Sequence, residues 1–288
     1  LITPLRNGGV DLSALQKLVE RQAAAGVQGI VVCATTGEGA TLTPDERRLV
    51  LDTAVKRVGD KIDVLFGISH IATWAVIEDM ARAADIGARG ALVSSPSYVK
   101  PSQDGLYGHY AAIADQSKLP IIMYNVPSRT ASDIKPATVA KLAAHERIVG
   151  IKEASGSVER AQQVIAASGG SIKVLSGDDP LTLSILVAGG HGVISTASNA
   201  VPEKWAQLWK RFCEGDILGA AAVQAGLLGL HEALFAETNP GPVKAALHLL
   251  GLIDAEIRLP LTWPSRPTVY RLAAELEKLG LKVAGGAQ

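Results

Sequence analysis

The amino-acid sequence predicts an α/β fold, a (β/α)8 TIM barrel with a C-terminal helical appendage. Short runs rich in Val, Ile, Leu and Ala recur along the chain without alternating polar and apolar residues. Such runs are typical of strands buried on both faces of a parallel sheet. Each run is followed by a polar turn and a segment with apolar residues at helical spacing. Eight such units in about 200 residues, with no Gly/Pro-rich linker between them, match the count of this barrel.

The predicted elements follow one another from the first residue. The strands are expected at 1–5, 27–33, 61–67, 88–95, 119–125, 147–152, 171–177 and 190–195. The helices between them are expected at 11–26, 43–59, 71–87, 104–117, 135–145 and 157–168. Later helices are expected at 203–216, 218–237, 241–251 and 267–280. We therefore predict a catalytic barrel over residues 1–215 and a helical C-terminal region over 216–288.

The competing fold is a doubly wound open sheet. That fold is expected to carry a glycine-rich phosphate loop after its first strand. The chain has "LITPLRNGGVD" there, which does not match such a loop. The sequence therefore favours the barrel.

Charge and cysteine content narrow the partners and the compartment. The chain of 288 residues has 28 basic and 28 acidic residues and no basic stripe, so neither nucleic acid nor a membrane surface is expected as a partner. Cys33 and Cys213 lack metal-ligand spacing, and we predict that they are reduced packing residues. No apolar stretch reaches about 18 residues and no leader precedes the first turn, which predicts a soluble, cytoplasmic protein. Because the chain opens on "LITPL" without methionine, we expect a short piece before Leu1.

The active site of such a barrel lies at the carboxyl ends of its strands, where polar residues gather. These ends are "ATTGE" (34–38), "GISH" (67–70), "SPSY" (95–98), "YNVPSRT" (124–130), "KEASG" (152–156), "SGDD" (176–179) and "STASN" (195–199). They contain hydroxyls, two tyrosines, a lysine and an arginine. No His, Asp or Glu cluster has metal-ligand spacing, so no metal is expected. None of the six histidines falls into a recognisable triad.

Lys152 ends the apolar run "RIVGIK" and is the strongest candidate for chemistry. Burial at a strand end disfavours the ammonium form and lowers the pKa of a lysine, and a neutral amine can form a Schiff base with a ketone. Alternatively, Lys152 pairs with Glu153 or extends to the barrel rim. The first interpretation is favoured by Tyr124, which ends the preceding strand and could relay protons.

Two further features of the strand ends suit anionic substrates. Thr35 and Thr36 offer hydroxyl and backbone N–H donors to a small carboxylate, although they could instead cap a helix. Arg129 offers a guanidinium fork to a second carboxylate.

Several of these motifs together resemble one family. They are "TTGE", "YNVPSRT", "GIKEASG", "SGDD", "GVIS" and "NPGPVKAALHLLGL", which occur in order over essentially the whole chain. The chain is thereby similar to the dihydrodipicolinate synthase and N-acetylneuraminate lyase family. The resemblance implies a class I, pyruvate-handling lyase on a (β/α)8 barrel. It also implies a homo-oligomer, either a dimer or a tetramer built as a dimer of dimers, with no cofactor beyond a Schiff base of pyruvate on Lys152.

The resemblance also implies roles for individual residues. Lys152 resembles the Schiff-base lysine, Tyr124 the proton relay and Thr36 its hydroxyl partner. Thr35 with Thr36 resembles the site for the pyruvate carboxylate, and the backbone of Ile194 is expected near the substrate. Tyr98 resembles the tyrosine that enters the neighbouring subunit's active site, although it could instead be a loop packing residue.

The position after "YNVPS" distinguishes the branches of the family, because the synthases have an arginine there. This chain resembles the synthases in having Arg129 at that position. The implied reaction condenses pyruvate with L-aspartate 4-semialdehyde to 4-hydroxy-tetrahydrodipicolinate, on the route to diaminopimelate and lysine. Ala34, the segment 66–74 and Ser97 depart from the usual pattern. The alternative is a paralogous pyruvate-dependent aldolase or dehydratase acting on a 2-keto-3-deoxy sugar acid or a related 2-oxo acid. A non-catalytic sensor is disfavoured because Lys152 and both tyrosines are retained.

The resemblance further predicts that the enzyme is not inhibited by lysine. Lysine-sensitive members hold the inhibitor at a subunit interface with a serine, two histidines, an asparagine, a glutamate and a tyrosine. This chain has Gly39, Pro44, Arg47, Ile71, Ala75 and Ser97 at those positions. Removing anionic and carbonyl partners from a desolvated diamine weakens its binding.

Overall fold

The structure, a computed structural model, describes residues 1–284. The chain forms two compact units, one from Val64 to Ser195 and one that combines Leu1–Asp63 with the chain from Thr196 onward. Both units contain strands and helices, which confirms the α/β class. The predicted division at residue 215 separates a catalytic barrel from a helical region, and it stays a prediction.

The unit from Val64 to Ser195 is built on a parallel sheet. Its strands are β4 (Asp63–Ile68), β5 (Gly90–Ser94), β6 (Ile121–Asn125), β7 (Ile148–Glu153) and β8 (Lys173–Ser176). They pair in chain order and every pair is parallel. Every residue of β5 is buried, as its apolar sequence predicts. The five strands confirm the five runs predicted between residues 61 and 177.

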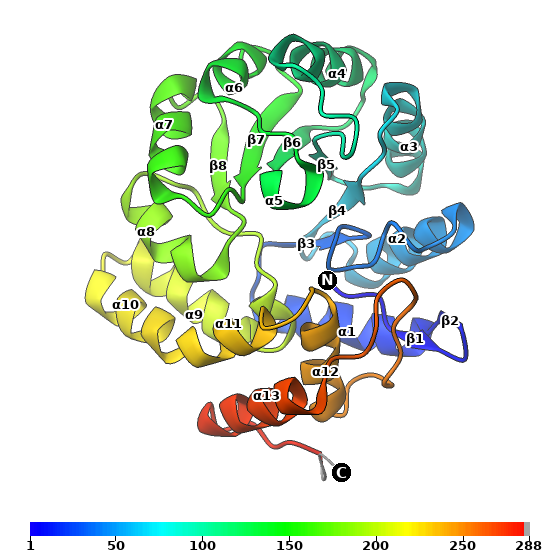
Figure 1. The fold of residues 1–288 in the computed structure, drawn as a ribbon, viewed down its shortest axis with the longest axis vertical. Helices are drawn as coiled ribbons and strands as arrows, with labels where there is room; N and C mark the ends of the chain where they lie inside the picture. Colours follow the sequence, from blue (N-terminus) through cyan, green and yellow to red (C-terminus); the bar gives the residue numbers. More distant parts are fainter. Residues whose placement is uncertain (285–288) are drawn as a thin grey trace. The chain divides into compact units, whose positions relative to one another are not determined.

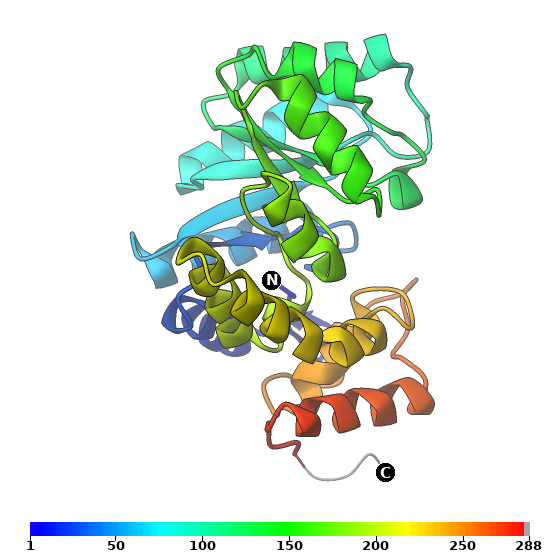
Figure 2. The same cartoon turned by 90° about the vertical axis from the view of Figure 1, so that its left-hand side faces the viewer.

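Helices connect the strands of this sheet. They are α3 (Thr73–Ile86), α4 (Gln103–Gln116), α5 (Pro127–Thr130), α6 (Pro136–Leu142), α7 (Val158–Ser168), the 3₁₀ turn η1 (Asp179–Leu181) and α8 (Thr182–Val187). Figures 1 and 2 show α3, α4, α6 and α7 as a layer along one face of the sheet, where neighbouring helices contact one another. Ser102 and Ser157 cap α4 and α7 by accepting hydrogen bonds from backbone N–H groups.

The last predicted strand, 190–195, is present only in part. Val193 forms an isolated parallel bridge with Ser176. Two backbone hydrogen bonds flank this bridge. The His191 N–H donates to the Val174 carbonyl oxygen at 2.8 Å, and the Ile194 N–H donates to the Ser176 carbonyl oxygen at 2.9 Å. Gly192 has φ 150°, a conformation that side-chain-bearing residues rarely adopt, which interrupts regular strand geometry within this segment.

The other unit contains the first part of the chain. A hairpin of β1 (Leu5–Arg6) and β2 (Gly9–Val10) leads into α1 (Leu12–Ala24), β3 (Gly29–Val32) and α2 (Pro44–Val58). The prediction of a strand at 1–5 was wrong over its first four residues, and Leu5 pairs antiparallel with Val10 rather than in a parallel sheet. The run is short and contains Pro4, which has no N–H to donate to a ladder.

The same unit contains the C-terminal helices. These are the 3₁₀ turn η2 (Ala197–Asn199), α9 (Pro202–Cys213), α10 (Ile217–Gly226), α11 (Leu228–Leu234), α12 (Gly241–Leu249) and α13 (Arg266–Lys278). Helix α13 packs against α11 and α12 (Figures 1 and 2). Within residues 1–284 no single helix is long and apolar enough to cross a membrane, and only the bent pair α10 and α11 reaches that length together.

Hydrogen bonds join the two chain segments of this unit. The Ile2 N–H donates to Asn199 Oδ1 at 2.9 Å. The Arg21 guanidinium donates to the carbonyl oxygens of Asn199 and Ala200 at 2.8 and 2.7 Å. The C-terminal helices are therefore part of the unit that carries β3 and the loop after it.

Candidate active site

Lys152 lies near the carboxyl end of β7 and is buried, with 9% of its surface exposed. In the sheet register it is directly opposite Tyr124 on β6. Its Nζ is 4.6 Å from the centre of the Tyr124 ring. Tyr124 is itself 7% exposed, so an amine and a phenol face each other at a site largely shielded from water. The structure thus brings together the two residues that the sequence singled out for Schiff-base chemistry.

The Glu153 carboxylate forms its hydrogen bonds with residues other than Lys152. Successive residues of a strand point to opposite faces. The Glu153 carboxylate accepts hydrogen bonds from Asn125 Nδ2 at 3.0 Å and from the Ser155 N–H at 2.8 Å. Burial raises the pKa of Glu153, against the opposing effect of these donors. The alternative in which Glu153 neutralises Lys152 is therefore not supported by the contacts.

Two residues of the "SGDD" segment lie beside Lys152. A Cβ added to Gly177 would be 2.5 Å from the Ala154 Cβ and 3.0 Å from the Lys152 Cε, so only glycine fits against this lysine. Asp178 accepts a hydrogen bond from the Gly156 N–H at 3.1 Å. Burial raises the pKa of Asp178, while the Gly156 N–H and the positive charge of Lys152 act in the opposite direction. The sequence indicated neither contact, because both depend on how β7 and β8 pair.

Tyr98 projects into solvent from the loop after β5. It is 86% exposed and has φ 70°, and Lys100 has φ 45°. Non-glycine residues rarely adopt this left-handed conformation, which costs roughly 1–3 kcal/mol. Its high exposure rules out the alternative of a loop packing residue within this chain. A large aromatic side chain held in this way is available for contact with another molecule.

Arg129 and Ile194 lie in the same unit as Lys152. Arg129 is exposed on the short helix α5, and its guanidinium has no hydrogen-bond or ion-pair partner among residues 1–284. Ile194 is partly buried, and its N–H donates to the carbonyl oxygen of Ser176, the last residue of β8. The Arg129 side chain is therefore free to pair with a ligand carboxylate.

Thr35 and Thr36 lie in the other unit, in the loop that follows β3. The Thr35 carbonyl oxygen accepts a hydrogen bond from the Glu38 N–H at 3.1 Å, which closes a turn. The Thr36 Oγ1 accepts a hydrogen bond from Asn239 Nδ2 at 3.0 Å. Thr43 caps α2 through a capping box with Glu46, so the alternative that Thr35 or Thr36 caps this helix is wrong. The sequence did not indicate Asn239 as a neighbour of this loop.

A model of the dihydrodipicolinate synthetase family matches residues 1–279. The chain belongs to this family. It is 45% identical to a 4-hydroxy-tetrahydrodipicolinate synthase of Anaeromyxobacter dehalogenans (strain 2CP-C), over 99% of this chain and 97% of the relative.

Solved structures of family members are also similar to this chain. The crystal structure of dihydrodipicolinate synthase from Aquifex aeolicus aligns with a TM-score of 0.96 and 42% identity, over 99% of this chain and 98% of that one. A structure described as the first monomeric dihydrodipicolinate synthase variant aligns with the same TM-score and 39% identity, over 98% and 95%. Similar members of the family thus include at least one monomeric variant.

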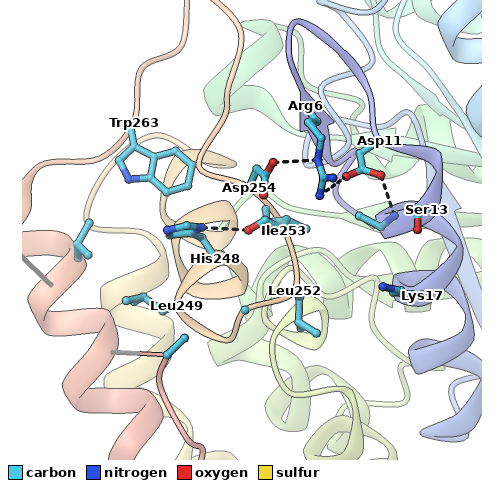
Figure 3. Close-up of a pocket in the computed structure, with 14 residues that line it drawn as sticks. Arg6, Asp11, Ser13, Lys17, His248, Leu249, Leu252, Ile253, Asp254 and Trp263 are labelled. Carbon is cyan, nitrogen blue, oxygen red and sulfur yellow. Dashed lines mark hydrogen bonds and ion pairs between the residues drawn. The ribbon is translucent and has the colours of Figure 1, made fainter. Parts of the chain in front are cut away.

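A cavity of about 610 Å³ in the unit with β3 is lined by none of the predicted site residues (Figure 3). Arg6 pairs there with Asp11 and Asp254, at 2.9 Å each. His248 Nδ1 lies 3.0 Å from the Ile253 carbonyl oxygen, to which it donates. This cavity is not taken as the candidate active site, because none of the residues predicted for Schiff-base chemistry lines it.

Metal-binding side chains and the cysteines do not change the assignment of Lys152 and Tyr124 as the candidate active site. Among residues 1–284 no group of three or more His, Cys, Asp and Glu side chains is placed to hold a metal ion. Neither Cys33 nor Cys213 forms a disulfide within residues 1–284. Cys33 is buried as predicted, whereas Cys213 is exposed, so the prediction that it packs inside was wrong. Cys213 is the last residue of the amphipathic helix α9, where its side chain falls on the solvent side.

Proposed function

We propose that this chain is a 4-hydroxy-tetrahydrodipicolinate synthase, a lyase that condenses pyruvate with L-aspartate 4-semialdehyde. The observation that carries the proposal is the buried Lys152 amine, 4.6 Å from the centre of the Tyr124 ring. The names of the family members at 45% identity support it. With it we propose the closed (β/α)8 barrel with a C-terminal helical appendage.

The first half of the proposed reaction loads pyruvate on the enzyme. Lys152 Nζ attacks the C2 carbonyl carbon, and the resulting carbinolamine loses water to give an iminium. Tyr124, with Thr36 as its hydroxyl partner, carries protons to the leaving oxygen. The iminium draws electrons from C3, which loses a proton to give an enamine. Since the iminium itself is the electron sink, the reaction needs no further cofactor.

The second half forms the new carbon–carbon bond. The enamine C3 attacks the aldehyde carbon of the semialdehyde, and the aldehyde oxygen takes up a proton. The amine of the semialdehyde then attacks the iminium carbon, closes the ring and displaces Lys152, which is regenerated. The product, 4-hydroxy-tetrahydrodipicolinate, leads to diaminopimelate and lysine.

The remaining site residues bind and orient the substrates in this proposal. Thr35 and Thr36 hold the pyruvate carboxylate through N–H and hydroxyl donors. Arg129 pairs with the semialdehyde carboxylate through its free guanidinium fork. The Ile194 backbone lies beside the substrate. Tyr98 completes the proton relay of a neighbouring copy, so the working enzyme is a dimer or a dimer of dimers.

An aldehyde panel tests this function. Purified protein is assayed with pyruvate and either aspartate semialdehyde or sugar-derived aldehydes such as glyceraldehyde, and product formation is followed for each. We expect kcat/KM for the semialdehyde to exceed that for every sugar-derived aldehyde. Faster turnover of a sugar-derived aldehyde would reassign the chain to a sugar-acid aldolase.

A further inference from the structure

Two contacts join the loop after β3 to the start of α12. Asn239 Nδ2 donates to Thr36 Oγ1 at 3.0 Å. Nearby, the Lys244 ammonium forms a hydrogen-bonded ion pair with the Glu38 carboxylate. Glu38 follows Thr36 by two residues and Lys244 follows Asn239 by five, so both contacts link the same two segments.

The ion pair gives this link a fixed geometry. The side chains of Lys244 and Glu38 are both 0% exposed. The second carboxylate oxygen of Glu38 accepts a hydrogen bond from the Arg258 N–H at 3.3 Å. Burial lowers the pKa of Lys244, and the charge of Glu38 opposes that effect. Breaking a buried pair leaves an uncompensated charge, so the loop and α12 are held together strongly.

The backbone of the loop also has little freedom. Glu38 has φ 54°, the left-handed conformation. A Cβ added to Gly39 would lie 1.8 Å from the Cys33 carbonyl oxygen. The turn that carries Thr36 is therefore confined on its C-terminal side, and Asn239 is the residue that reaches its hydroxyl.

The hydrogen-bond chemistry of the Asn239–Thr36 pair is directional. An amide nitrogen only donates, whereas a hydroxyl has one proton and two lone pairs. When Asn239 Nδ2 occupies a lone pair of the Thr36 oxygen, the Thr36 proton must point to a different acceptor. Asn239 is 6% exposed, and water therefore competes little for this bond.

We propose that Asn239 is a positioning residue, which turns the Thr36 hydroxyl proton towards the carboxylate of the 2-oxo acid substrate. This inference rests on the proposed function, in which Thr36 binds that carboxylate. The C-terminal segment thereby sets the affinity of the first substrate without touching it. The affinity of the second substrate is not expected to depend directly on Asn239.

A double-mutant cycle tests the inference. The variants are Asn239→Ala, Thr36→Val and the combination of both, each assayed for pyruvate KM, semialdehyde KM and kcat. We expect Asn239→Ala to raise the pyruvate KM about tenfold, since a hydrogen bond to a charged group contributes roughly that factor. In the Thr36→Val background the same substitution should change the pyruvate KM less than about twofold. An equal rise in both backgrounds, or a rise confined to the semialdehyde KM, overturns the inference.

Asn239→Asp is the second variant, because it keeps the shape of the side chain and cannot donate as a carboxylate. It should raise the pyruvate KM at least as much as Asn239→Ala, and an unchanged pyruvate KM would mean that donation to Thr36 is not used. Borohydride reduction with pyruvate distinguishes failure of this inference from failure of the proposed function. If the unsubstituted protein forms an adduct on Lys152 but the cycle shows no coupling, this inference alone fails. If no adduct forms, the proposed function fails with it.

Discussion

Lys152 and Tyr124 are register partners on adjacent parallel strands, and the lysine Nζ is 4.6 Å from the centre of the phenol ring. The pairing of β6 with β7 fixes this relationship, because residues opposite each other in a ladder project on the same face. A buried amine beside a phenol combines a nucleophile with a proton carrier. The proposed Schiff-base chemistry depends on this pair.

Replacing Arg129 with Ala should chiefly impair the second substrate. The free guanidinium of Arg129 is proposed to bind the semialdehyde carboxylate, and losing a charge-assisted hydrogen bond costs about 1.5–3 kcal/mol. The semialdehyde KM should therefore rise by roughly 10- to 100-fold, while adduct formation from pyruvate changes little. Steady-state kinetics with each substrate varied in turn measures this. Arg129→Lys is the matched control, and it should recover part of the affinity because it keeps the charge but loses the fork.

Tyr98 should act in a neighbouring copy of the chain. The side chain is 86% exposed, so it makes little contact with its own chain, and its backbone has a positive φ. Tyr98→Phe and Lys152→Ala should each be nearly inactive, whereas mixed oligomers of the two should regain activity, because one interface then combines an intact lysine with an intact tyrosine. Hybrids are verified by native mass spectrometry before the assay. Verified hybrids without activity would contradict a shared site.

L-Lysine should not inhibit the enzyme at physiological concentration. Ile71 and Ala75 offer no side-chain partner to an ammonium group, and losing one buried charge partner weakens binding roughly 30-fold or more. The structure adds a reason at Gly39, where a Cβ would lie 1.8 Å from the Cys33 carbonyl oxygen, so a serine cannot replace it without moving the backbone. Rates are measured with L-lysine up to millimolar concentration. Saturable inhibition below that range would show that another pocket binds lysine.

His109 should make stability depend on pH. Its Nδ1 lies 2.9 Å from the Thr73 hydroxyl, and burial lowers the pKa of His109 to about 4. The unfolded chain takes up this proton near pH 6.5, and the folded chain takes it up only near the lowered pKa. The unfolded state therefore binds more protons between these values, so stability is full above about pH 6.5 and is lost as the pH falls towards 4.

His109→Gln is the variant that isolates this effect, since glutamine can bond to Thr73 but does not titrate. Between pH 7 and pH 5 the free energy of unfolding should fall by about 2 kcal/mol more in the unsubstituted protein than in the variant. Urea unfolding at the two pH values measures the difference. Parallel pH dependence of the two proteins would show that His109 is protonated as easily in the folded chain as in the unfolded one.

The sequence predicted the two strands that carry Lys152 and Tyr124. The apolar run 147–152 predicted a buried strand that ends in lysine, and β7 (Ile148–Glu153) confirms it. Tyr124 was predicted at the preceding strand end, and β6 places it there. These predictions succeed because a buried parallel strand has a clear apolar signature and because consecutive parallel strands align their ends.

Contacts between distant segments could not be predicted from local patterns. Asn239 and Thr36 are 203 residues apart in sequence, and Lys244 and Glu38 are 206 apart. The apolar helix around Lys244 suits a buried position, but no local pattern indicates which acidic side chain would pair with this lysine. The prediction of a strand at 1–5 was wrong over its first four residues, because a short apolar run alone does not determine which strand it pairs with.

The proposed function depends first on a Schiff base between Lys152 and pyruvate. The direct measurement is incubation of the protein with pyruvate and borohydride, followed by proteolysis and mass spectrometry of the peptide that contains residue 152. We expect a reduced pyruvate adduct on Lys152, no adduct in Lys152→Ala, and slower formation of the same adduct in Tyr124→Phe. An unmodified Lys152 in the active protein, or an adduct on a different lysine, would contradict the mechanism.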